Sequence, residues 1–221
     1  MDRRAYLRGA AAVGVMGAAG CLGLGSSNPN VTLPEPDRQY ESADVPYPAW
    51  GEAIPDVTVP APLDDRDVGF DDVDRPQLVT FFYSHCQTVC PVLVSTMRRV
   101  QTHAIDNDYG DEVRFFPITF DPERDTADRL EAYAEKMNVD ADHGNWQFLR
   151  PASKARAEEV VTEEFGVAFE RTHPEEMEMY MFAHQDLTLL ANADGYVERT
   201  YRTDTSSAQA MIDDLRTLRE A

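Results

Sequence analysis

An apolar run of strand length leads into a pair of cysteines, and this junction restricts the folds open to the chain. Residues 78–83 (Leu-Val-Thr-Phe-Phe-Tyr) are apolar apart from one threonine, and Cys86 and Cys90 follow shortly after. Pro91 then begins a segment with apolar side chains at helical spacing, and proline is favoured at the first position of a helix. The sequence therefore predicts a strand, a loop containing Cys86, and a helix over residues 91–105 with Cys90 at or near its N-cap.

Both thiols are predicted to be acidic. Unpaired N–H groups and the positive end of the helix dipole stabilise a thiolate at such a position. Two thiolates four residues apart form either a reducible disulfide or a pair of soft metal ligands. The alternative to a redox or metal-binding role is that the two cysteines form a structural disulfide or remain buried free thiols.

The first residues are expected to form an export signal. Residues 3–8 (Arg-Arg-Ala-Tyr-Leu-Arg) resemble a twin-arginine signal, and the small and apolar residues after them are too few to span a bilayer. Residues 18–21 (Ala-Ala-Gly-Cys) resemble a lipoprotein cleavage box. We expect residues 1–20 to be removed and Cys21 to carry a lipid, which would hold the chain on the extracytoplasmic face of the cell membrane. The alternative is that Cys21 is an incidental thiol in a discarded peptide.

The next segment, residues 21–54, is expected to be a flexible tether, because it lacks an amphipathic period. Its prolines are Pro29, Pro34, Pro36, Pro46 and Pro48. Residues 55–221 are long enough for one domain with a full core.

The formal charge of -20 bears on partners rather than on fold. An acidic surface repels nucleic acid and anionic lipid headgroups, so no nucleic-acid partner is expected. The charge fits adaptation to high salt, which screens self-repulsion, although an acidic protein without this adaptation is the alternative. We expect a monomer.

The remaining pattern predicts an α/β fold. Predicted strands are residues 78–83, 113–120, 146–149, 167–170, 180–183, 187–191 and 196–201, after a short pair at 56–63 and 68–73. Predicted helices are residues 91–105, a segment capped by Asp125 or Thr126, residues 152–165, and a last helix capped within 205–207. Pro117 implies a bulge or an unpaired side, and Asp194-Gly195 a hairpin. This order is typical of a thioredoxin-like sandwich, a central mixed β-sheet flanked by helices.

Three motifs in this order resemble the Sco/SenC copper proteins. They are Cys86-x-x-x-Cys90-Pro91, the segment 121–126 (Asp-Pro-Glu-Arg-Asp-Thr), and His184 shortly before the Asp-Gly hairpin. In that family two cysteines and a distant histidine bind one copper ion on a thioredoxin fold. The resemblance, which covers about residues 56–221, therefore implies Cys86, Cys90 and His184 as ligands of one Cu(I) or Cu(II) ion. The chain departs from the family pattern at Gln87, Ala183 and Gln185.

The resemblance implies a membrane-tethered copper chaperone rather than an enzyme. Its expected client is the dinuclear copper centre in subunit II of a haem-copper oxidase. The alternative function is that of a thiol–disulfide oxidoreductase, which would use Cys86 and Cys90 to reduce the client's cysteines. A thiol peroxidase is disfavoured, because residues 82–85 do not supply the sequence context that commonly precedes the reactive cysteine of those enzymes.

The other polar candidates are given structural or supporting roles. Asp121, Arg124 and Asp125 are predicted to form a helix cap with an arginine–carboxylate brace, or to orient the thiol loop from behind the ligands. His85, His103, His143 and His173 are expected not to bind the metal. The alternation of Met177, Met179 and Met181 is typical of a half-buried strand rather than of thioether ligands.

Overall fold

The computed structural model describes residues 28–38, 40–175, 178–203 and 207–221. Its strands are β1 (Thr58–Ala61), β2 (Arg66–Gly69), β3 (Gln77–Phe82), β4 (Arg114–Thr119), β5 (Phe169–Thr172), β6 (Met181–His184), β7 (Thr188–Ala191) and β8 (Val197–Tyr201). Its helices are α1 (Val89–Asp106), α2 (Ala127–Met137), α3 (Lys154–Ala157), which continues as the π-helix η4 (Glu158–Glu164), and α4 (Ala208–Glu220). Short 3-10 turns are η1 (Ser42–Asp44), η2 (Phe70–Asp72) and η3 (Gly110–Glu112). The predicted signal peptide and Cys21 lie outside the described residues.

The central sheet has four strands in the order β4-β3-β7-β8. β3 pairs with β4 in parallel and with β7 antiparallel, and β7 pairs antiparallel with β8. Every residue of β3 is buried, because successive side chains point to opposite faces and both faces are covered. Phe81 packs edge-on against Phe165, whereas Phe82 stacks on Tyr133 of α2. The mixed sheet and its flanking helices confirm the predicted thioredoxin-like sandwich.

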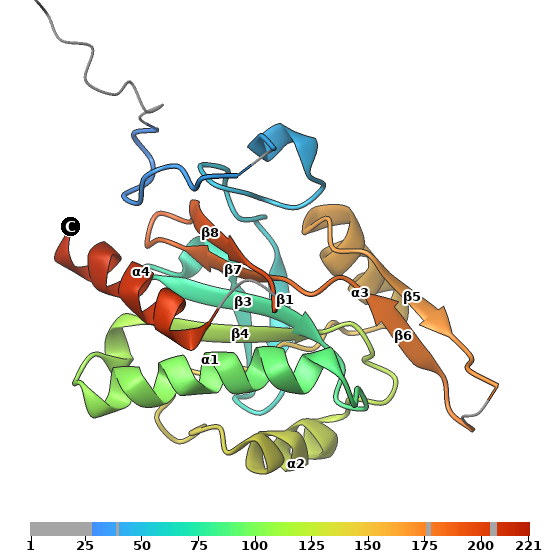
Figure 1. Cartoon of the computed structure of the whole chain (residues 1–221). Helices are drawn as coiled ribbons and strands as arrows, with labels where there is room; N and C mark the ends of the chain where they lie inside the picture. Colours follow the sequence, from blue (N-terminus) through green and yellow to red (C-terminus); the bar gives the residue numbers. More distant parts are fainter. Residues whose placement is uncertain (1–27, 39, 176–177, 204–206) are drawn as a thin grey trace, which may run out of the picture.

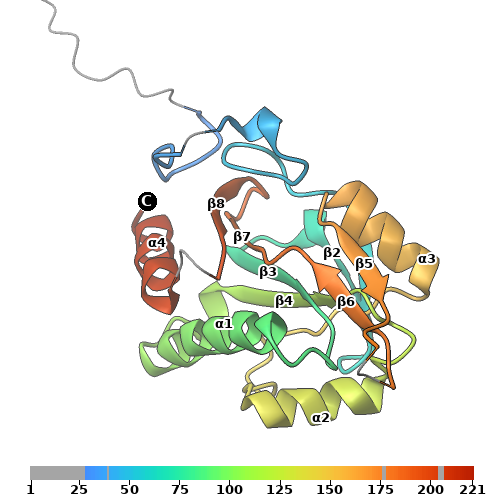
Figure 2. The same cartoon turned by 45° about the vertical axis from the view of Figure 1, so that its right-hand side comes forward.

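Helix α1 lies between α4 and α2 (Figures 1 and 2). Its inward stripe includes Val94, Met97 and Val100, all buried at helical spacing. The helix begins at Val89, two residues earlier than predicted, so Pro91 is its third residue rather than its first. Proline is accommodated there because the first four N–H groups of a helix have no partner within the helix.

Pro117 lies in β4, the edge strand of the four-stranded sheet, and shows neither a bulge nor a fully unpaired side. Its carbonyl accepts a hydrogen bond from the Leu149 N–H, whereas its own nitrogen has no hydrogen to donate. The predicted strand at 146–149 forms only isolated bridges, Phe115 with Trp146 and Ile118 with Leu149.

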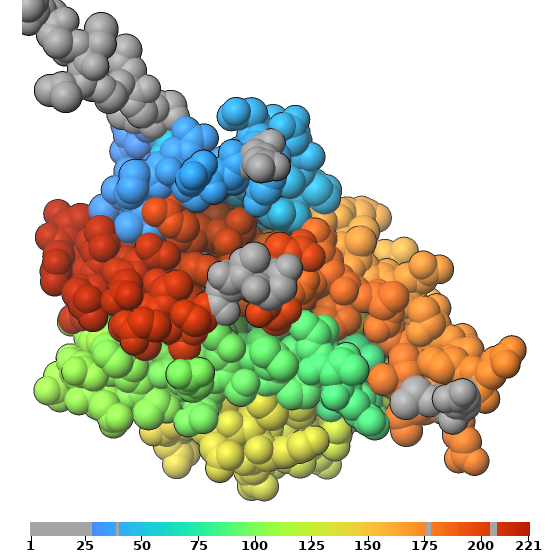
Figure 3. Space-filling view, viewed as in Figure 1, coloured from blue at the N-terminus to red at the C-terminus, as the bar shows by residue number. Residues whose placement is uncertain are grey.

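Residues 28–54 do not form the flexible tether that we predicted. Trp50 is buried, and its indole N–H donates to the Leu33 carbonyl. The carboxylate of Glu198, in β8, accepts the backbone N–H groups of Thr32 and Leu33, each at 2.8 Å. Figure 3 shows this N-terminal segment lying against the C-terminal part of the chain. Prolines rule out a helical period here, but they do not prevent an irregular segment from burying its apolar side chains.

The hairpin of β5 and β6 forms a separate two-stranded sheet beside the central one (Figure 1). A second small sheet consists of β1 and β2, at the predicted strand pair, but β2 ends at Gly69 and the 3-10 turn η2 replaces the rest of the predicted second strand. Within the described parts of the chain, no helix has the length and apolar character needed to cross a membrane.

Candidate metal centre

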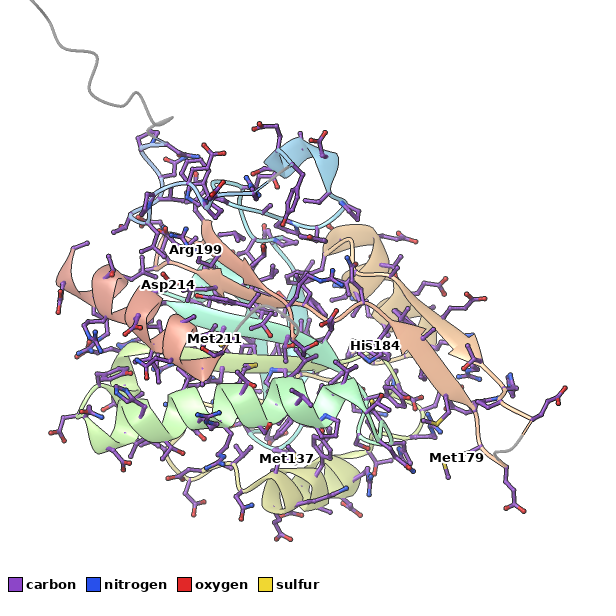
Figure 4. The ribbon with its side chains drawn as sticks, viewed as in Figure 1. Met137, Met179, His184, Arg199, Met211 and Asp214 are labelled. Atoms are coloured by element: carbon purple, nitrogen blue, oxygen red, sulfur yellow. The ribbon has the colours of Figure 1, made fainter. Side chains whose placement is uncertain are left out.

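Three side chains from distant parts of the sequence meet at one end of the central sheet. Cys86 lies in the loop after β3, and Cys90 is the second residue of α1. His184 is the last residue of β6 (Figure 4). Their candidate ligand atoms all lie within 4.8 Å of one another. The Nε2 atom of His184 is 3.2 Å from the Cys90 sulfur. The structure thus brings together the three residues named from the sequence.

The spacing of these atoms suits a single metal ion. Ligands bound at about 2.0–2.3 Å lie about 3.5–4 Å from one another around an ion, so only small shifts would close the described trio around one. Two sulfur donors and one imidazole nitrogen form a soft donor set, which favours copper or zinc over magnesium or calcium. The arrangement therefore fits a thiophilic metal ion and leaves a coordination position open.

Cys86 is the acidic thiol of the pair. The pKa of Cys86 is lowered to about 3, and the largest cause is the hydrogen bond with the Cys90 side chain. The hydrogen bond with the Thr88 side chain adds to this effect. Burial acts in the opposite direction but does not cancel this effect. The backbone N–H of Cys90 points at the Cys86 sulfur from 3.4 Å, as expected for a thiolate beside the first turn of a helix.

Cys90 is not the second acidic thiol that we predicted. Burial raises the pKa of Cys90 well above its usual range, and the neighbouring negative Cys86 raises it further. The side chain has no solvent exposure. The helix end cannot offset the cost of a second negative charge in this buried position. The pair is thus one thiolate and one thiol, and no disulfide joins them.

The imidazole of His184 presents Nε2 to the two sulfurs. Its Nδ1 atom is 3.0 Å from the Gln185 carbonyl, which can only accept a hydrogen bond. We therefore place the proton on Nδ1, which leaves the lone pair of Nε2 free for a metal ion. The ring lies edge-on to Tyr83 and packs against Phe120, so its orientation is fixed by aromatic neighbours.

Asp125 holds the backbone just before the thiol loop. Its buried carboxylate accepts the Ser84 N–H at 3.1 Å and the hydroxyls of Ser84 and Thr119. Arg129 donates to the Ser84 hydroxyl at 2.8 Å and to the Ser84 carbonyl at 3.0 Å. Burial raises the pKa of Asp125 despite these hydrogen bonds. Of the two predicted helix caps, Asp125 and Thr126, the structure has Thr126, whose side chain accepts the Arg129 N–H.

Asp121 and Arg124 contact the strand that carries His184. Arg124 Nε donates to Asp121, as the predicted brace requires, and Arg124 Nη1 donates to the Tyr180 carbonyl at 2.9 Å. The Tyr180 hydroxyl donates to Asp121 at 2.8 Å. Burial, followed by the hydrogen bond to Asp121, raises the pKa of Tyr180 to about 12, so the phenol keeps the proton that it donates.

The remaining histidines have other surroundings. His85 turns toward Asp125, with 3.7 Å between Nδ1 and the carboxylate. His103 is half-buried rather than solvated, because its Nδ1 lies 2.6 Å from the Tyr109 hydroxyl. Met181 lies in β6 as predicted, Met179 is 46% exposed, and Met177 lies outside the described residues.

Residues that sequence reasoning missed surround the trio. Ser84, Arg129, Tyr83 and Tyr180 all contact the ligands or the loops that carry them. Tyr83 and Ser84 adjoin the cysteine motif, and Tyr180 precedes His184 by four residues on the predicted strand. Nearness to a motif was therefore the available signal, but it does not say which neighbours face the site.

Comparisons with known proteins agree with this fold. The SCO1/SenC family model matches residues 65–220. The chain is 27% identical over 124 residues to the SCO1 protein homolog of Bacillus subtilis, which is 56% of this chain and 60% of that protein. The chain thus spans about 60% of the length of the curated relatives that it matches.

Solved structures share the fold at lower identity. The structure of Arabidopsis thaliana ScoI with copper bound matches with a TM-score of 0.61 and 19% identity, over 76% of this chain and 99% of that one. The structure of BsSco, described as a Sco-family cytochrome c oxidase assembly protein with a disulfide switch, matches with a TM-score of 0.61 and 22% identity, over 78% of this chain and 95% of that one. At these identities the likeness establishes the fold.

Proposed function

The chain belongs to the SCO1/SenC family, and from this premise we propose that it is a metallochaperone that binds one copper ion through Cys86, Cys90 and His184 and passes it to a partner. The observation that carries the proposal is the convergence of the three ligand atoms within 4.8 Å. Thiolates favour Cu(I), and an imidazole nitrogen helps to hold Cu(II), so the trio accepts either state of the ion.

An open coordination position makes this site suited to transfer rather than storage. With three protein ligands, a ligand from a partner can enter and bind the ion before the chaperone's own ligands leave. Zinc would also accept two cysteines and a histidine, but copper binds more strongly in the general order of divalent ions.

The proposed client is the dinuclear copper centre in subunit II of a haem-copper oxidase. The family resemblance supports this client, and BsSco is itself described as a cytochrome c oxidase assembly protein. The proposed location is the extracytoplasmic face of the cell membrane, with a lipid on Cys21 after removal of residues 1–20; the sequence around Cys21 supports this part of the proposal.

Anaerobic copper titration of the wild type and its single variants tests the copper site. We expect one ion per chain, and loss of tight binding in Cys86→Ser, Cys90→Ser and His184→Ala. His143→Ala is the matched control, because His143 lies in a loop outside the trio. Unchanged affinity in His184→Ala, or loss of affinity in the control, would contradict the proposed ligand set.

Thiol–disulfide exchange is the second candidate function. An acidic Cys86 beside a protonated Cys90 is the asymmetry that lets one sulfur attack a disulfide while the other resolves the mixed intermediate. The His184→Ala variant separates the two functions. It should lose copper affinity but keep dithiol exchange if copper transfer is the main role, whereas intact copper binding in that variant favours the reductase.

A further inference from the structure

The hairpin that carries His184 is attached to the protein mainly by side chains. β5 and β6 pair with each other and do not join the central sheet. Figure 4 shows His184 at the inner end of this hairpin and Met179 toward its outer end. The position of the imidazole relative to the two sulfurs therefore depends on what fixes the hairpin against the loops beside it.

Tyr180, directly before β6, makes several polar contacts between the hairpin and the loop after β4, and Arg171 in β5 adds an ion pair with Glu123 in that loop. The Tyr180 hydroxyl donates to Asp121, and the Tyr180 carbonyl accepts from Arg124. The guanidinium carbon of Arg124 lies 3.6 Å from the centre of the Tyr180 ring, and that of Arg171, in β5, lies 3.9 Å from it. Two cations against one ring, together with two hydrogen bonds, hold this residue in one place.

The strand transmits this position to His184. Side chains two residues apart on a strand share a face, so Tyr180, Phe182 and His184 project to the same side. The Phe182 ring packs on Tyr83 and Phe120, and its N–H donates to the Tyr83 hydroxyl at 3.3 Å. The apolar rings bury one face of the hairpin. The contacts of Tyr180 are directional, and they set the orientation of β6 relative to the thiol loop.

We infer that Tyr180, clasped by Arg124 and Arg171 and bonded to Asp121, is a positioning residue that places the His184 imidazole against the cysteine pair. The inference rests on the proposed copper site. Without these contacts of Tyr180, the hairpin stays packed through Phe182 but rotates about this residue. The Nε2 atom of His184 then spends less time within reach of an ion that the two sulfurs hold. The nitrogen ligand should then weaken while the two sulfur ligands stay in place.

The predicted signature is a split between the two copper states. Loss of a group that orients a metal ligand typically costs about 10 to 100-fold in affinity, and we expect a loss of this size for Cu(II) in Tyr180→Leu. Cu(I), held by the soft sulfurs, should change by no more than about threefold. Tyr180→Phe keeps the ring between the guanidinium groups and removes only the hydroxyl, so its Cu(II) loss should be smaller.

Two further measurements report on the position of His184 and on the local order of its hairpin, rather than on the overall stability of the protein. In the Cu(II) protein, the nitrogen hyperfine splitting in electron paramagnetic resonance should weaken in Tyr180→Leu. In the metal-free protein, amide hydrogen exchange should quicken in β5 and β6 and stay unchanged in β3. Tyr109→Leu is the matched control, because Arg219 also stacks on Tyr109, at 3.8 Å, but that pair lies beyond the C-terminal end of α1.

The outcomes separate this inference from the proposed function. If wild type binds copper and His184→Ala loses Cu(II), but Tyr180→Leu keeps wild-type Cu(II) affinity and hyperfine splitting, the positioning role is wrong and the copper site stands. Equal losses of Cu(I) and Cu(II) in Tyr180→Leu, or the same split in Tyr109→Leu, also contradict it. If wild type binds no copper, the proposed function itself fails. Should Tyr180→Leu not fold, Tyr180→Phe carries the same comparison.

Discussion

Copper loading should release about one proton per ion at neutral pH, because the two thiols start in different states. The structure lowers the pKa of Cys86 to about 3, so this sulfur is a thiolate throughout the physiological range. It raises the pKa of Cys90, which therefore enters the reaction as a thiol and must lose its proton to bind the ion.

Other protonation states of the two thiols would release different numbers of protons per copper ion. An ordinary thiol with a pKa of about 8.5 is about nine-tenths protonated at pH 7.5, so two ordinary thiols would release about 1.8 protons. Two acidic thiols, as the sequence predicted, would release close to none.

Anaerobic calorimetric titration with a Cu(I)–acetonitrile complex, repeated in buffers of different ionisation enthalpy, measures this count. A wild-type release near two would mean that Cys86 is not acidic. A release near zero would mean that burial does not keep the proton on Cys90, and either result would refute the reasoning.

Three further predictions concern the acidic thiol and two buried carboxylates. The rate at which iodoacetamide alkylates Cys86 should stay nearly flat from about pH 5 to pH 8, because a lowered pKa leaves thiolate at every pH in that window; a tenfold rise per pH unit, as for an ordinary thiol, would contradict it. Glu198→Ala should lower the free energy of unfolding in urea by about 3 kcal/mol, since it leaves the buried Leu33 N–H and the partly buried Thr32 N–H without their acceptor, whereas Glu220→Ala, at the exposed end of α4, should change it by less than about 0.5 kcal/mol. Asp125→Ala should also cost about 3 kcal/mol in urea, because its donors lose a buried acceptor, and an unchanged midpoint would show that water replaces the carboxylate there.

Local patterns were enough to predict most of the elements. The apolar run before the cysteines is β3, and the helical spacing after Pro91 is α1. The segment predicted as one helix at 152–165 proved to be a short α-helix continued by a π-helix, which ends where Gly166 adopts a positive φ of 65°. Periodicity marks the buried face of such a segment, but it does not distinguish hydrogen bonds to the fourth residue from those to the fifth.

Features that depend on packing at long sequence separation could not be predicted. The N-terminal segment was expected to be a tether because its prolines and acidic residues hide any period, yet Trp50 is buried and Glu198, far along the chain, binds the segment. The prediction that the Cys90 thiol is acidic was wrong for a similar reason. A helix start is visible in the sequence, whereas the complete burial of one sulfur and not the other becomes visible only in the fold.

The six-residue segment from Asp121 to Thr126 shows how the two kinds of information meet. The sequence marked it for its order of charges without saying what those charges contact. In the structure Asp125 holds Ser84, two residues before the first cysteine, while Arg124 holds Tyr180, four residues before the histidine. One short loop after β4 therefore contacts both arms of the site, from opposite sides. A change in this loop would alter the distance between the sulfurs and the imidazole, even though none of its residues belongs to the trio.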